Sequence, residues 1–394
     1  MGLKFKLAVD RIVQDKAYPA LATWPAEPYT EQWRQFVQQW PNTVPIELLE
    51  HCRTHGFECE LETVDTATDA YYPVGIGFFN FDVDYFALMT VAVRRKLQQQ
   101  QLTVLFYYHE GDNPFRIKDR LDELCQNHLL PVNCYRFVSG NTAADSIPGF
   151  AYFPDHELLF WHRNQGQAPA QLHNQPRANE FTALSRTHKW WRATVVTDMH
   201  RAGLLKNSIW SYGKVTINDR PEDNPIEIDA FDQLRPFVNA FLKQAPFVCD
   251  SLTSDEQNNH HLAVLDHYVN SYCNIVLETH FDADQSGGAF LTEKTFKPIK
   301  NAQPFVIVGA PGSLAALRKL GYRTFDHVID NSYDLELNNT QRWIKIKSAL
   351  QQIQQQDMHA WHEQCHDDIV HNQQLFCASK YTRLNNLLER LQHD

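Results

Sequence analysis

The feature that most constrains the fold is a run of apolar side chains, Phe305 to Val308, that follows a polar segment and precedes a glycine turn. A run without polar alternation is typical of a strand buried on both faces of a parallel sheet. Before it, the charged segment Phe290-Leu-Thr-Glu-Lys-Thr-Phe-Lys-Pro-Ile opens a short helix, and after Gly309-Ala-Pro-Gly312 a second helix runs from Ser313 to Leu320. We therefore expect an open parallel α/β sheet, with a phosphorylated ligand bound at the ends of its strands, next to the polar segment and the glycine turn.

Two charged residues, Glu293 and Lys294, stand side by side where the first of these helices begins. The lysine suits a phosphate and the glutamate suits a sugar hydroxyl, and Gly309 and Gly312 allow the turn to approach the same ligand. The alternative is a helix that simply begins with exposed charge.

Length and composition favour a globular protein of two domains. The chain has 394 residues, 43% of them hydrophobic and 21% charged, and it contains no run of about 18 apolar residues that would predict a membrane span. A net charge of −11 argues against a nucleic acid as the main partner, whereas an anionic small molecule held by a few placed cations remains compatible with it.

The cysteines indicate a reducing compartment. No two of them form a C-x-x-C pair in this long chain, so we expect free thiols and a cytoplasmic location. The N-terminus is too short and too charged for a secretory signal, and residues 4–9 are predicted to form the first strand. The eight cysteines stand at positions 52, 59, 125, 134, 249, 273, 365 and 377.

The clearest unit of the first half is a strand, polar turn, helix and strand. Leu102 to Tyr108 predicts a buried strand, Phe115 to His128 an amphipathic helix, and Val132 to Val138 the next strand. Glu110 and Asp112 therefore fall at the carboxyl end of a parallel strand, where ligands bind and where a carboxylate can serve as general acid or base. The alternative is an acidic helix start, with Asp112 or Asn113 as N-cap before Pro114. Further helices are predicted at 30–39, 45–55 and 85–100.

A polar, proline-containing stretch without periodicity, residues 164–179, is the best linker candidate. It predicts an N-terminal domain over residues 1–165, which we expect to bind the acceptor, and a C-terminal domain over residues 180–394.

Three cations follow the linker. Arg186, Lys189 and Arg192 run from the end of a predicted strand into the N-terminus of a helix over residues 191–202, which Gly203 is placed to stop. The helix dipole disfavours cations at that end, so a bound pyrophosphate is one explanation and a basic surface turn is the other. Further on, the apolar run from Asn274 predicts a buried strand ending in Glu278, which we count among the candidate donor-binding residues. Residues 324–334 predict a last strand and loop, and residues 340–394 a helical tail.

These motifs, taken in order, resemble the nucleotide-binding half of GT-B glycosyltransferases. The pattern Thr292-Glu-Lys-Thr-Phe-Lys-Pro-Ile followed by Gln303-Pro-Phe-Val-Ile-Val-Gly is closest to that of the alpha-1,3-fucosyltransferase family. Leu320-Gly-Tyr-Arg-Thr-Phe and Ile329-Asp-Asn-Ser-Tyr-Asp are similar to segments of uncharacterised glycosyltransferase-like proteins of bacteria and phages. The resemblance covers about residues 180–335.

The resemblance implies two Rossmann-like domains with a cleft between them and a nucleotide-sugar donor on the C-terminal domain. It places Glu293 on the ribose and Lys294 on a phosphate, with Arg186 or Arg192 as the upstream cation. It implies no required metal or cofactor, because cations and a helix N-terminus can stabilise the leaving diphosphate. Inverting transfer needs a general base, for which Glu110 is our first candidate and His109 and Asp112 are the reserves. The acceptor, a glycan or a protein, stays open.

Two alternatives belong to other functional classes. The segment His362-Glu363-Gln-Cys-His366 matches the H-E-x-x-H pattern of zinc hydrolases, in which two histidines on one helical face bind zinc and the glutamate acts as base; His371 is a conceivable third ligand. The other alternative is a relative of the transferase fold that binds a nucleotide or glycan without turnover.

Overall fold

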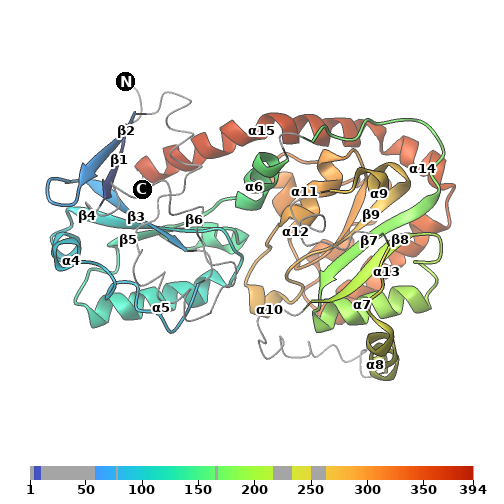
Figure 1. Ribbon diagram of the computed structural model, residues 1–394, viewed down its shortest axis with the longest axis horizontal. Helices are drawn as coiled ribbons and strands as arrows, with labels where there is room; N and C mark the ends of the chain where they lie inside the picture. Colours follow the sequence, from blue (N-terminus) through green and yellow to red (C-terminus); the bar gives the residue numbers. More distant parts are fainter. Residues whose placement is uncertain are drawn as a thin grey trace. The chain divides into compact units, whose positions relative to one another are not determined.

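A computed structural model describes residues 4–9, 58–76, 79–164, 167–215, 233–249 and 263–393. The predicted helices at 30–39 and 45–55 lie outside these ranges. The chain divides into two compact units, which we call unit 1 (Met1–Pro154 with Tyr381–Asp394) and unit 2 (Asp155–Lys380). Each unit has its own parallel sheet and its own apolar core, which confirms the predicted α/β class with two Rossmann-like parts (Figure 1).

Unit 1 is built on a six-stranded sheet in the order β2-β1-β3-β4-β5-β6, and every pairing is parallel. Aromatic side chains of β4, β5 and β6 pack together beneath it: Phe137 stacks on Phe150 at 4.9 Å between ring centroids and contacts Phe106 at 6.0 Å. The strands are β1 (Lys4–Val9), β2 (Glu58–Thr63), β3 (Ala70–Ile76), β4 (Leu102–Tyr108), β5 (Tyr135–Ser139) and β6 (Phe150–Tyr152).

The predicted strand–helix–strand unit is confirmed as β4, α5 (Pro114–Asn127) and β5. Asn113 is the N-cap of α5, with its side chain accepting a hydrogen bond from the Phe115 amide at 3.0 Å. The helix predicted at 85–100 is shorter than expected, since α4 covers only Val91–Gln98. The side chain of Thr90 caps its first turn by accepting from the Val93 amide, so the helix begins after it and residues 85–89 form turns. A 3₁₀ helix, η2 (Thr142–Ser146), follows β5.

Unit 2 is built on a four-stranded sheet in the order β10-β9-β7-β8, again with parallel pairing throughout. The chain passes from β7 to β8 on one side and later returns to β9 on the other side of β7, so the strand order reverses between β7 and β9. Ligands of open α/β sheets bind at the carboxyl ends of the two strands that flank such a reversal. The strands are β7 (Asn179–Thr187), β8 (Ile209–Val215), β9 (Ser271–Leu277) and β10 (Phe305–Val308).

The helices of unit 2 include those predicted from the sequence. The expected helix at 191–202 is α7, which Ala202 caps and Gly203 follows with a φ of +79°. The helical tail from 340 is confirmed as three helices, the last of which begins in unit 2 and ends in unit 1. The helices are α6 (Asp155–Arg163), α7 (Trp190–Arg201), α8 (Arg235–Gln244), α9 (Leu265–Val269), α10 (Ala283–Ser286), α11 (Glu293–Lys300), α12 (Ser313–Lys319), η4 (Ser332–Leu335), α13 (Asn339–Gln354), α14 (Met358–Gln364) and α15 (His366–His393).

Two predictions about this half are corrected. Residues 324–334 form turns and η4 instead of a strand, because Asp334 is drawn to α12, where its carboxylate accepts from the Leu314 and Ala315 amides at 2.8 and 2.9 Å. The described part of the stretch 164–179 is packed on unit 2 and is not a free linker. There the buried Arg177 donates to the carbonyls of Tyr268 and Ser271 at 2.7 and 2.9 Å.

The boundary between the units therefore differs from the predicted one at 165–180. It lies between Pro154 and Asp155, and the last residues of the chain belong to unit 1. Tyr71 in β3 donates to the Leu391 carbonyl at 2.5 Å, and Arg390 donates to the Phe150 carbonyl at 2.8 Å.

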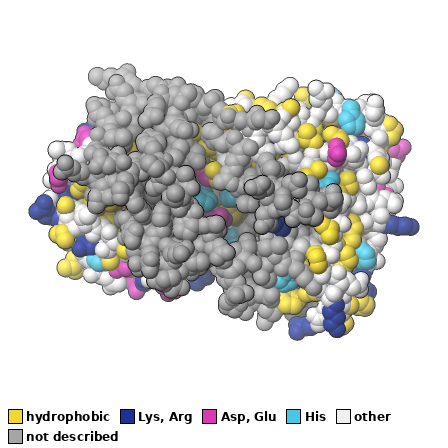
Figure 2. Space-filling view, viewed as in Figure 1, with side chains coloured by type: hydrophobic (Ala, Val, Ile, Leu, Met, Phe, Trp, Pro, Cys, Tyr) yellow, Lys and Arg dark blue, Asp and Glu magenta, His cyan; other side chains and the backbone are white. Residues whose placement is uncertain are grey.

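None of the helices in the described ranges has the length and apolar character needed to cross a bilayer. On the face drawn in Figure 2, the Lys and Arg side chains of the described residues are scattered instead of forming one stripe.

Candidate functional site

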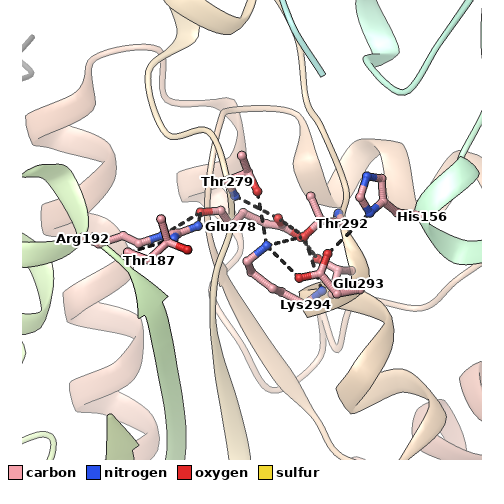
Figure 3. Close-up of polar contacts among 9 residues, drawn as sticks. His156, Thr187, Arg192, Glu278, Thr279, Thr292, Glu293 and Lys294 are labelled. Carbon is pink, nitrogen blue, oxygen red and sulfur yellow. Dashed lines mark hydrogen bonds and ion pairs between the residues drawn. The ribbon is translucent and has the colours of Figure 1, made fainter. Parts of the chain in front are cut away.

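Four of the predicted donor-binding residues of unit 2, Arg192, Glu278, Glu293 and Lys294, gather at the reversal of strand order. Residues 278–279 directly follow β9, Thr187 ends β7, and residues 292–294 begin α11 (Figure 3). Side chains from β7, α7, β9, α11 and α6 thus meet at the carboxyl ends of two parallel strands. We take this group as the candidate site.

The Glu278 carboxylate is the centre of the group. Its Oε1 accepts from the Thr292 amide at 3.0 Å and from the Thr295 hydroxyl at 2.6 Å, while its Oε2 accepts from the Thr292 hydroxyl at 2.7 Å and from the Thr279 amide at 3.0 Å. The residue is 1% exposed. Glu278, predicted to bind the ligand, therefore uses its carboxylate to fix the start of α11 against the end of β9.

Arg192 ties the two strand ends together. Its Nε and Nη2 donate to the Glu278 carbonyl at 3.1 and 2.5 Å, and its Nη1 donates to the Thr187 carbonyl at 3.3 Å. At 2% exposure the guanidinium is a part of the core, and it holds the backbone from which the site is built.

Glu293 is a buried carboxylate that lies between Lys294 and His156. Its Oε1 lies 3.0 Å from Lys294 Nζ, and its Oε2 lies 3.4 Å from His156 Nδ1 on α6 (Figure 3). Burial alone would raise its pKa, but Lys294 and then His156 outweigh that effect and hold the pKa of Glu293 well below its usual range. The carboxylate is therefore ionised and can accept hydrogen bonds from ligand hydroxyls.

Lys294 bridges three groups of the site. Besides Glu293, its ammonium donates to the hydroxyls of Thr279 at 3.2 Å and Thr292 at 3.0 Å. Lys294 and Arg192 thus contact residues 278–279 from opposite sides (Figure 3).

The glycine turn after β10 is held by hydrogen bonds to other parts of the chain. Gly312 has a φ of +81°, which favours glycine, and its amide donates to the Asp334 carbonyl at 2.8 Å. The Asp334 carboxylate accepts hydrogen bonds from the amides of Leu314 and Ala315, in the first turn of α12. A Cβ on Gly309 would lie 3.2 Å from the Glu278 Cβ, so this glycine permits close packing against β9. Both glycines thus have a structural role in the turn, and their contact with a phosphorylated ligand stays a prediction.

The other two predicted cations lie nearby in the chain but outside the hydrogen-bonded group of Figure 3. Arg186 stands in β7 at a register irregularity between Ser185 and Thr187, and its carbonyl oxygen is packed against Gly213 of β8. Lys189 is the N-cap residue of α7, without a side-chain cap bond. Their role as pyrophosphate ligands stays a prediction.

The predicted catalytic residues stand at the carboxyl end of β4 in unit 1. His109 Nε2 lies 3.8 Å from Glu110 Oε1, and both side chains are partly exposed. Asp112 accepts a short hydrogen bond from the buried Tyr108 hydroxyl. The loop is anchored from β5, since the Asn141 amide group donates to the Gly111 carbonyl at 2.9 Å. Of the two carboxylates in this loop, Asp112 is hydrogen-bonded to Tyr108, whereas the contact of Glu110 with His109 is longer, at 3.8 Å.

The H-E-x-x-H segment is not arranged as a zinc site. Helix α14 ends at Gln364 and α15 begins at His366, so the two histidines do not share one helical face. His362 is buried against Tyr272, while the side chain of His366 is 60% exposed. His371 Nε2 donates to the Gly321 carbonyl at 2.9 Å, and no group of three potential metal ligands occurs among the described residues.

Sequence reasoning missed several residues of the candidate site. No sequence pattern pointed to His156, because it is far from Glu293 in the sequence and only the folded chain brings the two side chains together. The hydroxyls of Thr279, Thr292 and Thr295 were quoted within motifs without a role. Lys297 was overlooked although its spacing of three residues from Lys294 places both on one helical face.

Comparison with known proteins adds little to this geometry. No protein-family model matches the sequence, and no curated protein matches it. One solved structure with a similar chain path is described as the DNA modifying enzyme beta-glucosyltransferase, in the presence and absence of its substrate uridine diphosphoglucose. The TM-score is 0.42 and the identity 10%, with 98% of this chain and 99% of that chain covered. At this level of similarity, no residue's role is transferred from it.

Replacing Glu278 tests its place at the centre of the site. In Glu278→Gln the amide nitrogen cannot accept, so two of the four buried donors lose their acceptor and face another donor. We expect a loss of about 2–4 kcal/mol in the free energy of unfolding, measured by urea denaturation. Glu363→Gln, at an exposed position, is the matched control. Equal stability of the two variants would contradict the assignment.

The buried His362 predicts a loss of stability in acid. Burial, and then the nearby charges of Arg177, His173, His359 and His366, lower the pKa of His362 from 6.5 to about 3. The unfolded chain therefore binds the proton first, and stability falls as the pH drops from 6.5 towards 3. Between pH 6.5 and about pH 5 this group alone removes up to about 2 kcal/mol.

The measurement is urea unfolding at about pH 7.5 and about pH 5. His362→Gln should show a smaller acid loss than the wild type, whereas His366→Gln, at an exposed position, should follow the wild type. An unchanged acid loss in His362→Gln would show that other groups carry it.

Proposed function

We propose that the protein is a glycosyltransferase that moves a sugar from a nucleotide-sugar donor held on unit 2. The observation that carries this proposal is the pairing of Glu293 and Lys294 at the start of α11, placed at the reversal of strand order. A helix N-terminus with a lysine suits the diphosphate, and an ionised carboxylate beside it suits the ribose or sugar hydroxyls. The ordered sequence resemblance to GT-B glycosyltransferases supports the same assignment.

In this proposal the leaving diphosphate is stabilised by the lysine and the helix N-terminus. Arg192 acts through the backbone by holding the ends of β7 and β9, and Glu278 acts by holding α11. Both are positioning residues. No metal or cofactor is proposed to take part, and the nucleotide that binds will narrow the choice of sugar.

For the acceptor side, we propose Glu110 as the general base, with His109 beside it and Asp112 as the reserve. A partly exposed carboxylate at the carboxyl end of a parallel strand can accept a hydroxyl proton. The acceptor is proposed to be a glycan or a protein. A binding protein without turnover is the alternative that the experiments below separate.

A nucleotide panel tests the donor site. One of UDP, GDP and CMP should raise the melting temperature of the wild type by several degrees at about 100 times its dissociation constant, because a ligand bound to the native state stabilises it. Lys294→Met should weaken that binding by about 10–100-fold through loss of a charged hydrogen-bond donor. Lys319→Met, at an exposed position in α12, is the control and should behave as wild type. Stabilisation by none of the three nucleotides would refute the donor site.

Turnover tests the general base. The wild type should slowly hydrolyse the nucleotide sugar that matches the bound nucleotide, with water as acceptor. Glu110→Gln should reduce this rate by about 100-fold or more while leaving nucleotide binding unchanged. Glu123→Gln, on the exposed side of α5, is the matched control. Binding without any hydrolysis in the wild type would favour the non-catalytic alternative, and full activity in Glu110→Gln would exclude Glu110 as the base.

A further inference from the structure

A second lysine of α11 stands beside the proposed donor site. Lys297 lies three residues after Lys294 and four after Glu293, so all three share one face of the helix. The two lysines differ in their contacts. The three hydrogens of the Lys294 ammonium meet three acceptors, whereas Lys297 Nζ makes no hydrogen bond or ion pair with any of the described residues.

Lys297 experiences the charges of two residues of the candidate site, Glu293 and Lys294. Burial lowers its pKa to about 8; Glu293 opposes this change and Lys294 adds to it. Among the described side chains of α6, β9 and the residue directly after β9, the charged or titratable groups are Asp155, His156, Glu157, Tyr272, Cys273 and Glu278. The Glu293 carboxylate is thus near enough to act on Lys297 without contacting it.

An ammonium that is partly withdrawn from water and lacks an acceptor is in an unfavourable state. An anion bound between Lys294 and Lys297 removes that disadvantage, since it supplies both acceptors and negative charge. Lys297 is the better placed of the two to supply new hydrogen bonds, because its donors are not already engaged.

We propose that Lys297 contacts the diphosphate of the donor together with Lys294, and that the deprotonated fraction of Lys297 takes up a proton from the solvent as the donor binds. The inference rests on the proposed function and adds to it a second phosphate ligand and a protonation step.

The sign of the pH dependence follows from the direction of the shift. In the free protein the proton on Lys297 is half lost at about pH 8. The negative charge of the diphosphate favours the charged form, so the pKa rises towards its ordinary value of 10.5 in the complex. Affinity for the nucleotide therefore falls as the pH rises, by about fourfold between pH 7 and pH 8.5.

The experiment is isothermal titration calorimetry of the wild type with UDP and with GDP at about pH 8, in two buffers of different ionisation enthalpy. The dependence of the heat on the buffer gives the number of protons exchanged. For the nucleotide that binds, we expect an uptake of about half a proton per molecule bound. The nucleoside alone, which lacks the diphosphate, should bind without uptake.

Variants separate the charge of Lys297 from its titration. Lys297→Arg keeps a cation that does not titrate in this range, so it should bind the nucleotide without taking up a proton. Lys297→Met should bind at least about tenfold more weakly, also without uptake. Lys319→Met, on α12, should keep the affinity and the proton uptake of the wild type.

The outcomes distinguish the inference from the proposed function. Nucleotide binding by the wild type without proton uptake overturns the inference and leaves the donor site standing. Uptake that persists in Lys297→Arg assigns the proton to another group and also overturns it. Binding of neither UDP nor GDP overturns the inference, and the donor site is refuted as well if CMP also fails to bind. The wild-type measurement decides even if a variant does not fold.

Discussion

The candidate site depends on one buried carboxylate. Glu278 stands where β9 ends, and its four hydrogen bonds fix the hydroxyls of Thr292 and Thr295 and the backbone at the start of α11. Because a buried charge is stable only when its acceptor sites are filled, these donors have a narrow range of positions. The position of Glu293 and Lys294, the next two residues, follows from it.

A second set of contacts fixes the backbone around this carboxylate. Arg192 donates to carbonyls at the ends of β7 and β9, and Arg342 donates to the carbonyls of Phe281 and Gly309, which follow β9 and β10. Arginine suits this task, because its planar group offers five donors in a fixed geometry. Burial lowers the pKa of Arg342 to about 10, so it stays charged near neutrality. Arg192 and Arg342 thereby supply hydrogen-bond donors to backbone carbonyls in the loops that follow the strands, and so fix these loops.

Local sequence patterns were sufficient to predict many of the helices and strands and some residues of the candidate site. The apolar run at Phe305 to Val308 predicted a buried parallel strand, and Gly203 marked the end of α7. What local patterns could not supply are contacts between residues far apart in sequence. The Thr292 and Thr295 hydroxyls reach Glu278 from 14 and 17 residues away, and Asp334 fills the amides of α12 from 20 and 19 residues away. That last contact also explains why a strand was wrongly predicted at 324–334.

The path of the chain has a consequence for dissecting the protein. Unit 1 contains two separate pieces of sequence, because residues 381–394 at the end of α15 return to it and Tyr71 binds the Leu391 carbonyl. A fragment cut after Pro154 would lose the Leu391 carbonyl that Tyr71 contacts, together with the buried side chains of Leu387, Leu388 and Leu391. Unit 1 is therefore best isolated as a circular permutant that joins residues 381–394 to the first strand, because truncation at the C-terminus removes residues that pack on strands from the start of the sequence.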